Sequence, residues 1–163
     1  MTARIRHAEP KDAVRIASLY NHYVRNSIVT FEEDDVSPQD MAGRIAAITA
    51  SFPWLVMEED GTLAGYAYAR KYHERAAYRH TVETAVYVDH TRHARGLGTE
   101  LYRNLLDRLP ALGIHAAIGL ISIPNPESIA LHEKCGFKKA GHVVEVGFKF
   151  GHWVDVGYWQ KIF

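Results

Sequence analysis

The segment from 81 to 109 constrains the fold most, because a strand pattern leads through a short basic loop directly into a helix pattern. Thr81 to Val88 alternates like a strand that is exposed on one face. Gly98 to Leu109 is strongly amphipathic, and Pro110 closes it because proline cannot continue a helix. The apolar stretch from Ala116 to Ile123 then reads as a second strand. A strand–helix–strand unit of this kind places a helix on one face of a sheet.

The rest of the chain adds elements on both sides of this unit. Its periodicity predicts a strand that opens at Ile5 and further strands over 54–58, 63–70, 141–146 and 155–161, with helices over about 14–26, 37–48 and 126–134. The predicted order is β-α-α-β-β-β-α-β-α-β-β. Helices alternate with strands in the second half, so we expect an α/β fold with a mixed central sheet and helices on its faces.

Length, charge and cysteine content narrow the class of protein. The 163 residues suit a single domain over 1–163. Nineteen basic and nineteen acidic side chains leave no formal net charge, which argues against a nucleic-acid-binding protein. The single cysteine, Cys135, allows no intrachain disulfide and favours a reducing compartment. The chain shows no signal-peptide pattern, and no apolar run approaches the ~20 residues of a membrane span. We therefore expect a cytoplasmic protein without a membrane or nucleic-acid partner.

The connection between the strand and the helix has the features of an anion-binding site. It comprises Ala94, Arg95, Gly96, Leu97, Gly98 and Thr99. Backbone N–H groups at a helix N-terminus lack internal partners, and the helix dipole favours negative charge there. Arg92 and Arg95 add positive charge. Two glycines alone are equally compatible with an ordinary tight turn, and the segment lacks the third glycine of a dinucleotide fingerprint and the Gly-Lys-Ser/Thr of a P-loop.

A second motif follows at a fitting separation. Ile118 to Pro126 leads into Leu131-His132-Glu133-Lys134-Cys135-Gly136-Phe137. The two motifs together resemble the signatures of the GCN5-related N-acetyltransferases. Further segments resemble the phosphinothricin and methionine sulfoximine acetyltransferases of that superfamily, and these are 20–21, 30–32, 53–56, 65–69, 81–83, 86–88, 131–133 and 151–160.

The resemblance implies a fold, a reaction and an assembly. It implies the acyl-CoA N-acyltransferase fold, whose mixed sheet is mostly antiparallel with helices on both faces. The acetyl donor would be acetyl-CoA, and the acceptor would be the α-amino group of a small glutamate-like amino-acid analogue such as phosphinothricin or methionine sulfoximine. The protein would be a homodimer without a metal ion.

The resemblance also implies residue roles. Glu83 matches the family's catalytic glutamate and would accept the proton of the amine through water. Without the resemblance, a glutamate on a half-exposed strand is more often a surface residue. Backbone groups of Val86, Tyr87 and Val88 would hold the pantetheine arm and the thioester oxygen. The segment 94–99 would bind the pyrophosphate. Asn125 matches a cofactor-contacting asparagine, although Pro-Asn-Pro is also a good helix start.

Two histidines depart from the wider superfamily. His132 stands where many members have a tyrosine that protonates the departing thiolate, and it would donate that proton or position the amine. The alternative is a helix-face histidine packed against the sheet. His93 stands where glutamine or arginine is preferred, so we expect weaker or pH-sensitive cofactor binding.

Four residues are expected to contact the amine substrate. They are Phe31, Arg75, Tyr78 and Tyr87. Arg75 and Tyr78 lie in a basic stretch, 70–80, that would recognise a carboxylate, although charge runs are usually solvated loops. Ten histidines form no metal-binding spacing. Two alternatives remain open: acetylation of another primary amine, such as a protein N-terminus or a polyamine, and a non-catalytic acyl-CoA-binding module.

Overall fold

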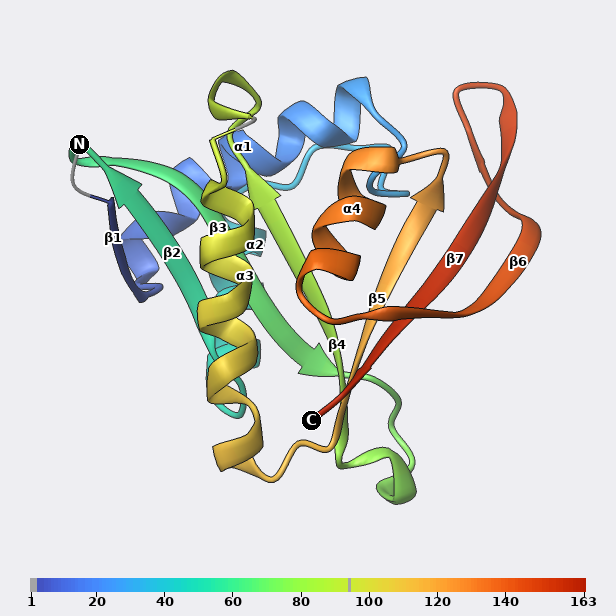
Figure 1. Cartoon of the computed structure of the whole chain (residues 1–163). Helices are drawn as coiled ribbons and strands as arrows, with labels where there is room; N and C mark the ends of the chain where they lie inside the picture. Colours follow the sequence, from blue (N-terminus) through green and yellow to red (C-terminus); the bar gives the residue numbers. More distant parts are fainter. Residues whose placement is uncertain (1–2, 94) are drawn as a thin grey trace.

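The computed structural model describes residues 3–93 and 95–163, which form one seven-stranded sheet with helices packed on it (Figure 1). The strand order is β1-β2-β3-β4-β5-β7-β6, and every neighbouring pair is antiparallel except β4 and β5. The strands are β1 Ala3–His7, β2 Trp54–Glu59, β3 Thr62–Lys71, β4 Thr81–Val88, β5 Ala116–Ile123, β6 Lys138–Lys149 and β7 His152–Ile162. The helices are α1 Ala13–Asn26, α2 Pro38–Thr49, α3 Leu97–Arg108 and α4 Pro126–Lys134. The predicted fold class is confirmed.

The predicted ends of helices and strands agree best with the observed ones where the apolar pattern and the turn chemistry coincide. β4, β5 and α4 begin and end at the predicted residues. The predicted start of α2 is also correct, because the Ser37 side chain accepts a hydrogen bond from the Asp40 N–H at 3.0 Å and caps the helix. β6 and β7 are longer than expected. Their register shifts between Val143 and Gly147, where Glu145 has a φ of 52°, and this irregularity interrupts the alternating pattern.

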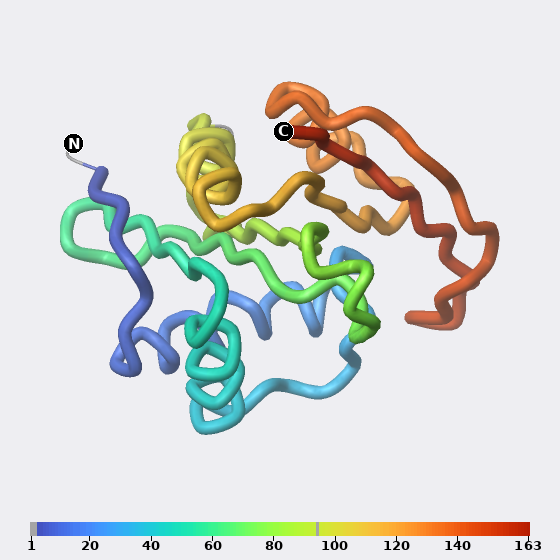
Figure 2. Tube along the Cα trace, turned by 90° about the horizontal axis from the view of Figure 1, so that it is seen from below, coloured from blue at the N-terminus to red at the C-terminus, as the bar shows by residue number. Residues whose placement is uncertain are grey.

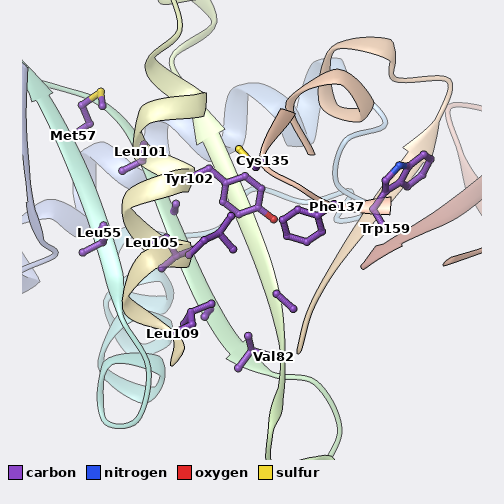
Figure 3. Close-up of a cluster of buried hydrophobic side chains, with 14 of the residues drawn as sticks. Leu55, Met57, Val82, Leu101, Tyr102, Leu105, Leu109, Cys135, Phe137 and Trp159 are labelled. Atoms are coloured by element: carbon purple, nitrogen blue, oxygen red, sulfur yellow. The ribbon is translucent and has the colours of Figure 1, made fainter. Parts of the chain in front are cut away.

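The sheet separates two apolar cores. On one face, α1 and α2 pack against β2 and β3 around Trp54, Val56 and Tyr66. On the other face, α3 packs against β2, β3 and β4, and α4 packs beside it against β5 (Figure 2). The close-up in Figure 3 shows the second core, in which Leu101, Tyr102 and Leu105 of α3 meet side chains of the sheet. Successive residues of a strand therefore point into different cores.

The parallel pairing of β4 and β5 is short. It covers only Thr81–Glu83 of β4 against Ala116–Ile118 of β5. Beyond that point β4 continues along β3 and β5 continues along β7, so the two strands diverge toward their C-terminal ends (Figure 1). The divergence opens the middle of the sheet on the side where the predicted cofactor loop lies.

No helix within the described residues is long and apolar enough to cross a membrane.

Candidate active site

The C-terminal half of β4 presents backbone groups to the opening beside β5. The Asp89 N–H donates to the Ala64 carbonyl of β3 at 2.8 Å. Because successive residues of a strand direct their backbone groups to alternate sides, Val86 and Val88 direct theirs away from β3, toward the opening. Tyr87 directs its carbonyl to β3, where it lies 2.8 Å from the position a Cβ on Gly65 would take. Of the three predicted residues, Val86 and Val88 thus present backbone to the opening, whereas Tyr87 presents its backbone to β3.

Glu83 lies at the point where the two strands separate. It is the last residue of β4 that pairs with β5, opposite Ile118. Its side chain is 19% exposed, and Arg70 of β3 donates a hydrogen bond from Nη2 to its Oε1 at 2.8 Å. Arg70 is its direct neighbour across the antiparallel pair. The carboxylate is therefore half-buried and fixed by one cation from the adjacent strand.

Glu83 and His132 lie on opposite faces of the sheet. Val82 belongs to the core beneath α3, so Glu83, the next residue, points to the face that carries α1 and α2. His132 of α4 packs against Tyr102 and Phe137 on the α3 face. The two predicted catalytic residues thus approach the divergence of β4 and β5 from different sides, and they do not form one hydrogen-bonded pair.

A chain of hydrogen bonds fixes the His132 ring. Its Nδ1–H donates to the Ser128 carbonyl at 2.7 Å, because a carbonyl has no proton to give. In the neutral ring Nε2 then accepts a hydrogen bond from the Tyr102 hydroxyl at 3.1 Å. The Tyr102 oxygen lies 2.6 Å from Oγ1 of Thr84 on β4. The ring also lies directly over Gly119, where an added Cβ would come within 2.5 Å of Nε2. His132 is thus packed between α4 and the sheet, and Tyr102 links it by hydrogen bonds to Thr84 of β4.

The start of α3 uses its two glycines for different reasons. Gly96 is the N-cap and has a φ of 76°, in the left-handed region that glycine adopts without strain. Gly98 lies in the first turn, where an added Cβ would be 3.0 Å from Leu131 of α4 and 3.3 Å from Val88 of β4. The helix starts at Leu97, one residue before the predicted start. Its N-terminal N–H groups therefore lie close to the end of β4, which is a geometry that fits a pyrophosphate.

Side chains anchor the loop before α3 to the sheet. Asp89 is buried, accepts a hydrogen bond from the Thr91 N–H at 2.9 Å and pairs with Arg15 of α1. Arg92 and Arg95 both pair with Glu59 at the end of β2. Ala94, which belongs to the predicted cofactor site, lies outside the described residues, while Arg95 to Thr99 lie within them.

His93 contacts α1 through Tyr23. The Tyr23 hydroxyl donates to the Val88 carbonyl of β4. Because this bond uses the one hydroxyl proton, His93 donates from Nε2 to the Tyr23 oxygen, at 2.7 Å. Tyr23 therefore joins the cofactor loop to the backbone that lines the opening, and it occupies one of the Val88 groups that the pantetheine arm was expected to meet.

Asn125 begins α4 and also borders a cavity. Its Oδ1 accepts a hydrogen bond from the Ser128 N–H at 3.1 Å and caps α4. It also lines a cavity of about 440 Å³ between the end of α1, the β5–α4 connection and the β6–β7 turn. The lining residues are Asn26, Ser27, Ile28, Val29, Pro124, Asn125, Pro126, Glu127 and Phe150.

The four predicted substrate residues lie in three places. Phe31 packs on β6, where its ring lies 2.4 Å from the position of a Cβ on Gly147. The Tyr87 ring meets Tyr20 edge-on at a centroid distance of 5.4 Å. Arg75 and Tyr78 lie in the β3–β4 connection, at the opposite end of β4 from the cofactor loop.

The α1–α2 connection, which carries Phe31, is fixed by a buried cation. Lys149 of β6 donates from Nζ to the carbonyls of Ser27 at 2.8 Å and Thr30 at 2.7 Å. Burial lowers the pKa of Lys149.

Within residues 3–93 and 95–163, no group of three or more histidine, cysteine, aspartate or glutamate side chains is arranged to hold a metal ion.

Residues 5–157 match the family of acetyltransferase (GNAT) domains. The chain belongs to the GNAT family. It is 38% identical over 159 residues to a phosphinothricin N-acetyltransferase of Streptomyces viridochromogenes, covering 98% of this chain and 87% of that one. The structure of a phosphinothricin acetyltransferase from Sinorhizobium meliloti in complex with acetyl-CoA superposes with a TM-score of 0.95 at 36% identity, covering 99% and 89% of the two chains.

A third GNAT relative has a different acceptor in its name. A ribosomal-protein-alanine N-acetyltransferase of Brucella melitensis superposes with a TM-score of 0.96 at 32% identity, covering 98% of this chain and 99% of that one. The family and its neighbours establish this chain as an acetyl-CoA-dependent N-acetyltransferase.

The buried position of His132 gives a prediction for stability against pH. Burial lowers the pKa of His132 below its ordinary value. The unfolded chain therefore takes up a proton below pH ~6.5 that the folded chain does not, and the free energy of unfolding falls as the pH falls. Urea unfolding at pH 7.5 and 5.5 should show a smaller loss for His132→Gln than for the unsubstituted protein. His115→Gln, at an exposed position, is the control. An equal loss in all three proteins would contradict the prediction.

Proposed function

We propose that this N-acetyltransferase transfers the acetyl group to the α-amino group of a small amino-acid analogue such as phosphinothricin or methionine sulfoximine. The observation that carries the proposal is the position of Glu83 at the point where β4 and β5 separate, beside the part of β4 that no longer pairs with β5. The single cysteine favours a reducing compartment, and we place the activity in the cytoplasm.

The proposed roles follow from the two faces of the sheet. Acetyl-CoA supplies a thioester carbonyl when it is bound. Glu83 accepts the proton of the substrate ammonium through water, because an α-amine is largely protonated at neutral pH. Backbone N–H groups of Val86 and Val88 donate toward the thioester oxygen, and fixed dipoles of this kind stabilise developing charge. His132 lies on the face opposite to Glu83, so in this proposal it assists at the sulfur and not at the amine.

Removing the carboxylate of Glu83 should slow turnover without weakening the binding of acetyl-CoA. We expect Glu83→Gln to lower kcat/KM by about 10²–10⁴-fold, the usual contribution of a general base. The dissociation constant of acetyl-CoA, measured by calorimetry, should stay unchanged. Asp107→Asn, an exposed acid on α3, is the matched control. Full activity of Glu83→Gln would remove Glu83 from the mechanism.

The β3–β4 connection supports a substrate that bears a carboxylate. Arg75 is the N-cap of its short helical turn, and Tyr78, the last residue of that turn, is 41% exposed. A guanidinium binds a carboxylate through two parallel hydrogen bonds. Such a group favours an amino-acid substrate over a polyamine, because two cations repel. The Brucella relative supports a protein N-terminus as the second candidate acceptor.

An amine panel separates these acceptors. Phosphinothricin, methionine sulfoximine, methionine sulfone, glutamate, an alanine-terminated peptide and spermidine are ranked by kcat/KM with a free-thiol readout. We expect the two analogues to rank first, and Arg75→Ala to raise KM for phosphinothricin about tenfold, the value of a charge-assisted hydrogen bond. Arg79→Ala, in the same loop, is the control. A preference for the peptide would support the second candidate, and turnover of none would support a binding module.

We also propose a homodimer formed through the β6–β7 hairpin. The hairpin exposes apolar side chains together, at Val143, Val144, Val146, Phe148, Phe150 and Trp153. Exposed apolar patches of this kind mark contact surfaces. A second copy of the chain would cover them, in agreement with the homodimer that the family resemblance implies.

A charge within the hairpin patch should separate the subunits. Val144 is 69% exposed, so Val144→Asp should fold normally, yet it would bury a charge in the interface. Analytical ultracentrifugation should show a dimer for the unsubstituted protein and for Val14→Asp, at a similarly exposed valine on α1, and a monomer for Val144→Asp. A monomer in all three would exclude the dimer.

A further inference from the structure

Glu59 is a buried carboxylate that the proposed chemistry does not use. It is the last residue of β2, and its side chain is 4% exposed. Arg92 donates from Nη1 to its Oε2. Arg95 donates from Nη1 to Oε2 at 2.9 Å, and its Nη2 lies 2.9 Å from Oε1. One carboxylate thus binds two guanidinium groups of the cofactor loop, one of them through both oxygens.

This cluster joins the sheet to the loop immediately before α3. Arg95 precedes Gly96, the N-cap of α3. Burying a carboxylate is costly unless it is fully paired, and removal of its partners is strongly destabilising. The pairing therefore holds the backbone at Arg95, and with it the direction of the N–H groups that follow. The loop is positioned from β2, more than 30 residues away in sequence.

The same pairing determines which groups are left for an anion. Arg92 and Arg95 direct guanidinium N–H groups at Glu59, and the carboxylate offsets one of their two charges. The N-terminal N–H groups of α3 lie beside the loop and carry the positive end of the helix dipole. A diphosphate bound at this site would therefore contact chiefly the backbone N–H groups at the start of α3.

We infer that Glu59 positions the cofactor loop, so that backbone N–H groups at the start of α3 bind the diphosphate of acetyl-CoA while Arg92 and Arg95 serve as anchors. The inference rests on the proposed role of the segment 94–99. In the competing arrangement the two arginines leave Glu59 and contact the diphosphate directly. The two arrangements predict opposite effects of removing the Glu59 charge.

The experiment measures binding of acetyl-CoA and of its nucleotide half, 3′-phosphoadenosine 5′-diphosphate, by calorimetry. Glu59→Gln should weaken both ligands about tenfold, the effect of one charge-assisted hydrogen bond. It should raise KM for acetyl-CoA by the same factor and leave kcat and the amine KM unchanged. Glu59→Asp, which keeps the charge, should restore part of the affinity. Glu58→Gln is the matched control, since Glu58 is the preceding residue and pairs with Arg6.

Two further variants make each outcome decisive. Arg92→Ala should also weaken binding, since it removes an anchor. Weaker binding in Arg92→Ala together with tighter or unchanged binding in Glu59→Gln would overturn the inference and support direct arginine contacts. If Glu59→Gln does not fold, Glu59→Asp must show weaker binding than the unsubstituted protein, and unchanged binding would overturn the inference.

Gly98→Val fills the space beside Leu131 and Val88. If it leaves binding of the nucleotide half unchanged, the proposed role of the loop fails independently of Glu59.

Discussion

The structure depends on how briefly β4 and β5 pair. Among the described residues, three of each strand form the one parallel contact of the sheet, and the strands then diverge. A continuous pairing would satisfy the backbone of Val86 and Val88 within the sheet and leave it unavailable to a ligand. The divergence leaves these groups without a strand partner on the β5 side, although Tyr23 already donates to the Val88 carbonyl, and each strand is held on its outer side, β4 by β3 and β5 by β7. It also opens the sheet at one point between its two faces, and this is where we propose that the bound donor and the amine meet.

The elements that the sequence predicted correctly are those whose signals are local. β5 has an apolar run, α4 has Asn125 and Pro126 at its start and Gly136 after its end, and such signals act within a few residues. The divergence of β4 from β5 has no comparable signal, because Thr84 to Val88 reads as an ordinary strand and pairs as one on the β3 side. The irregular register of β6 was missed for the same reason, since a single residue with positive φ reverses the alternation that the pattern assumes.

Within the candidate site, Glu59 shows most clearly that local sequence signals do not reveal contacts between distant residues. Glu59 directly precedes the turn at Asp60 and Gly61 that joins β2 to β3. The side chain of Glu59, however, is buried against two arginines that lie 33 and 36 residues further along the chain. Arg70 is similar, because its contact with Glu83 follows from the β3–β4 register and not from its place in a basic stretch. Residues carried over from the family could be named from sequence, whereas residues that orient them could only be found once the chain was folded.

The charge distribution explains how a chain without net charge can hold a polyanionic donor. Charges of the cofactor loop are partly offset within the protein. Glu59 pairs with Arg92 and Arg95 and offsets one of their two charges, and Asp89 of the loop pairs with Arg15 of α1. The oriented backbone at the start of α3 adds a field that acts over the first turn and falls off beyond it. Such a site selects by geometry, because an anion gains from it only when its oxygens reach the N–H groups. Gly98 matters here for its small size, since Leu131 and Val88 already pack within 3.3 Å of the space that a side chain would need.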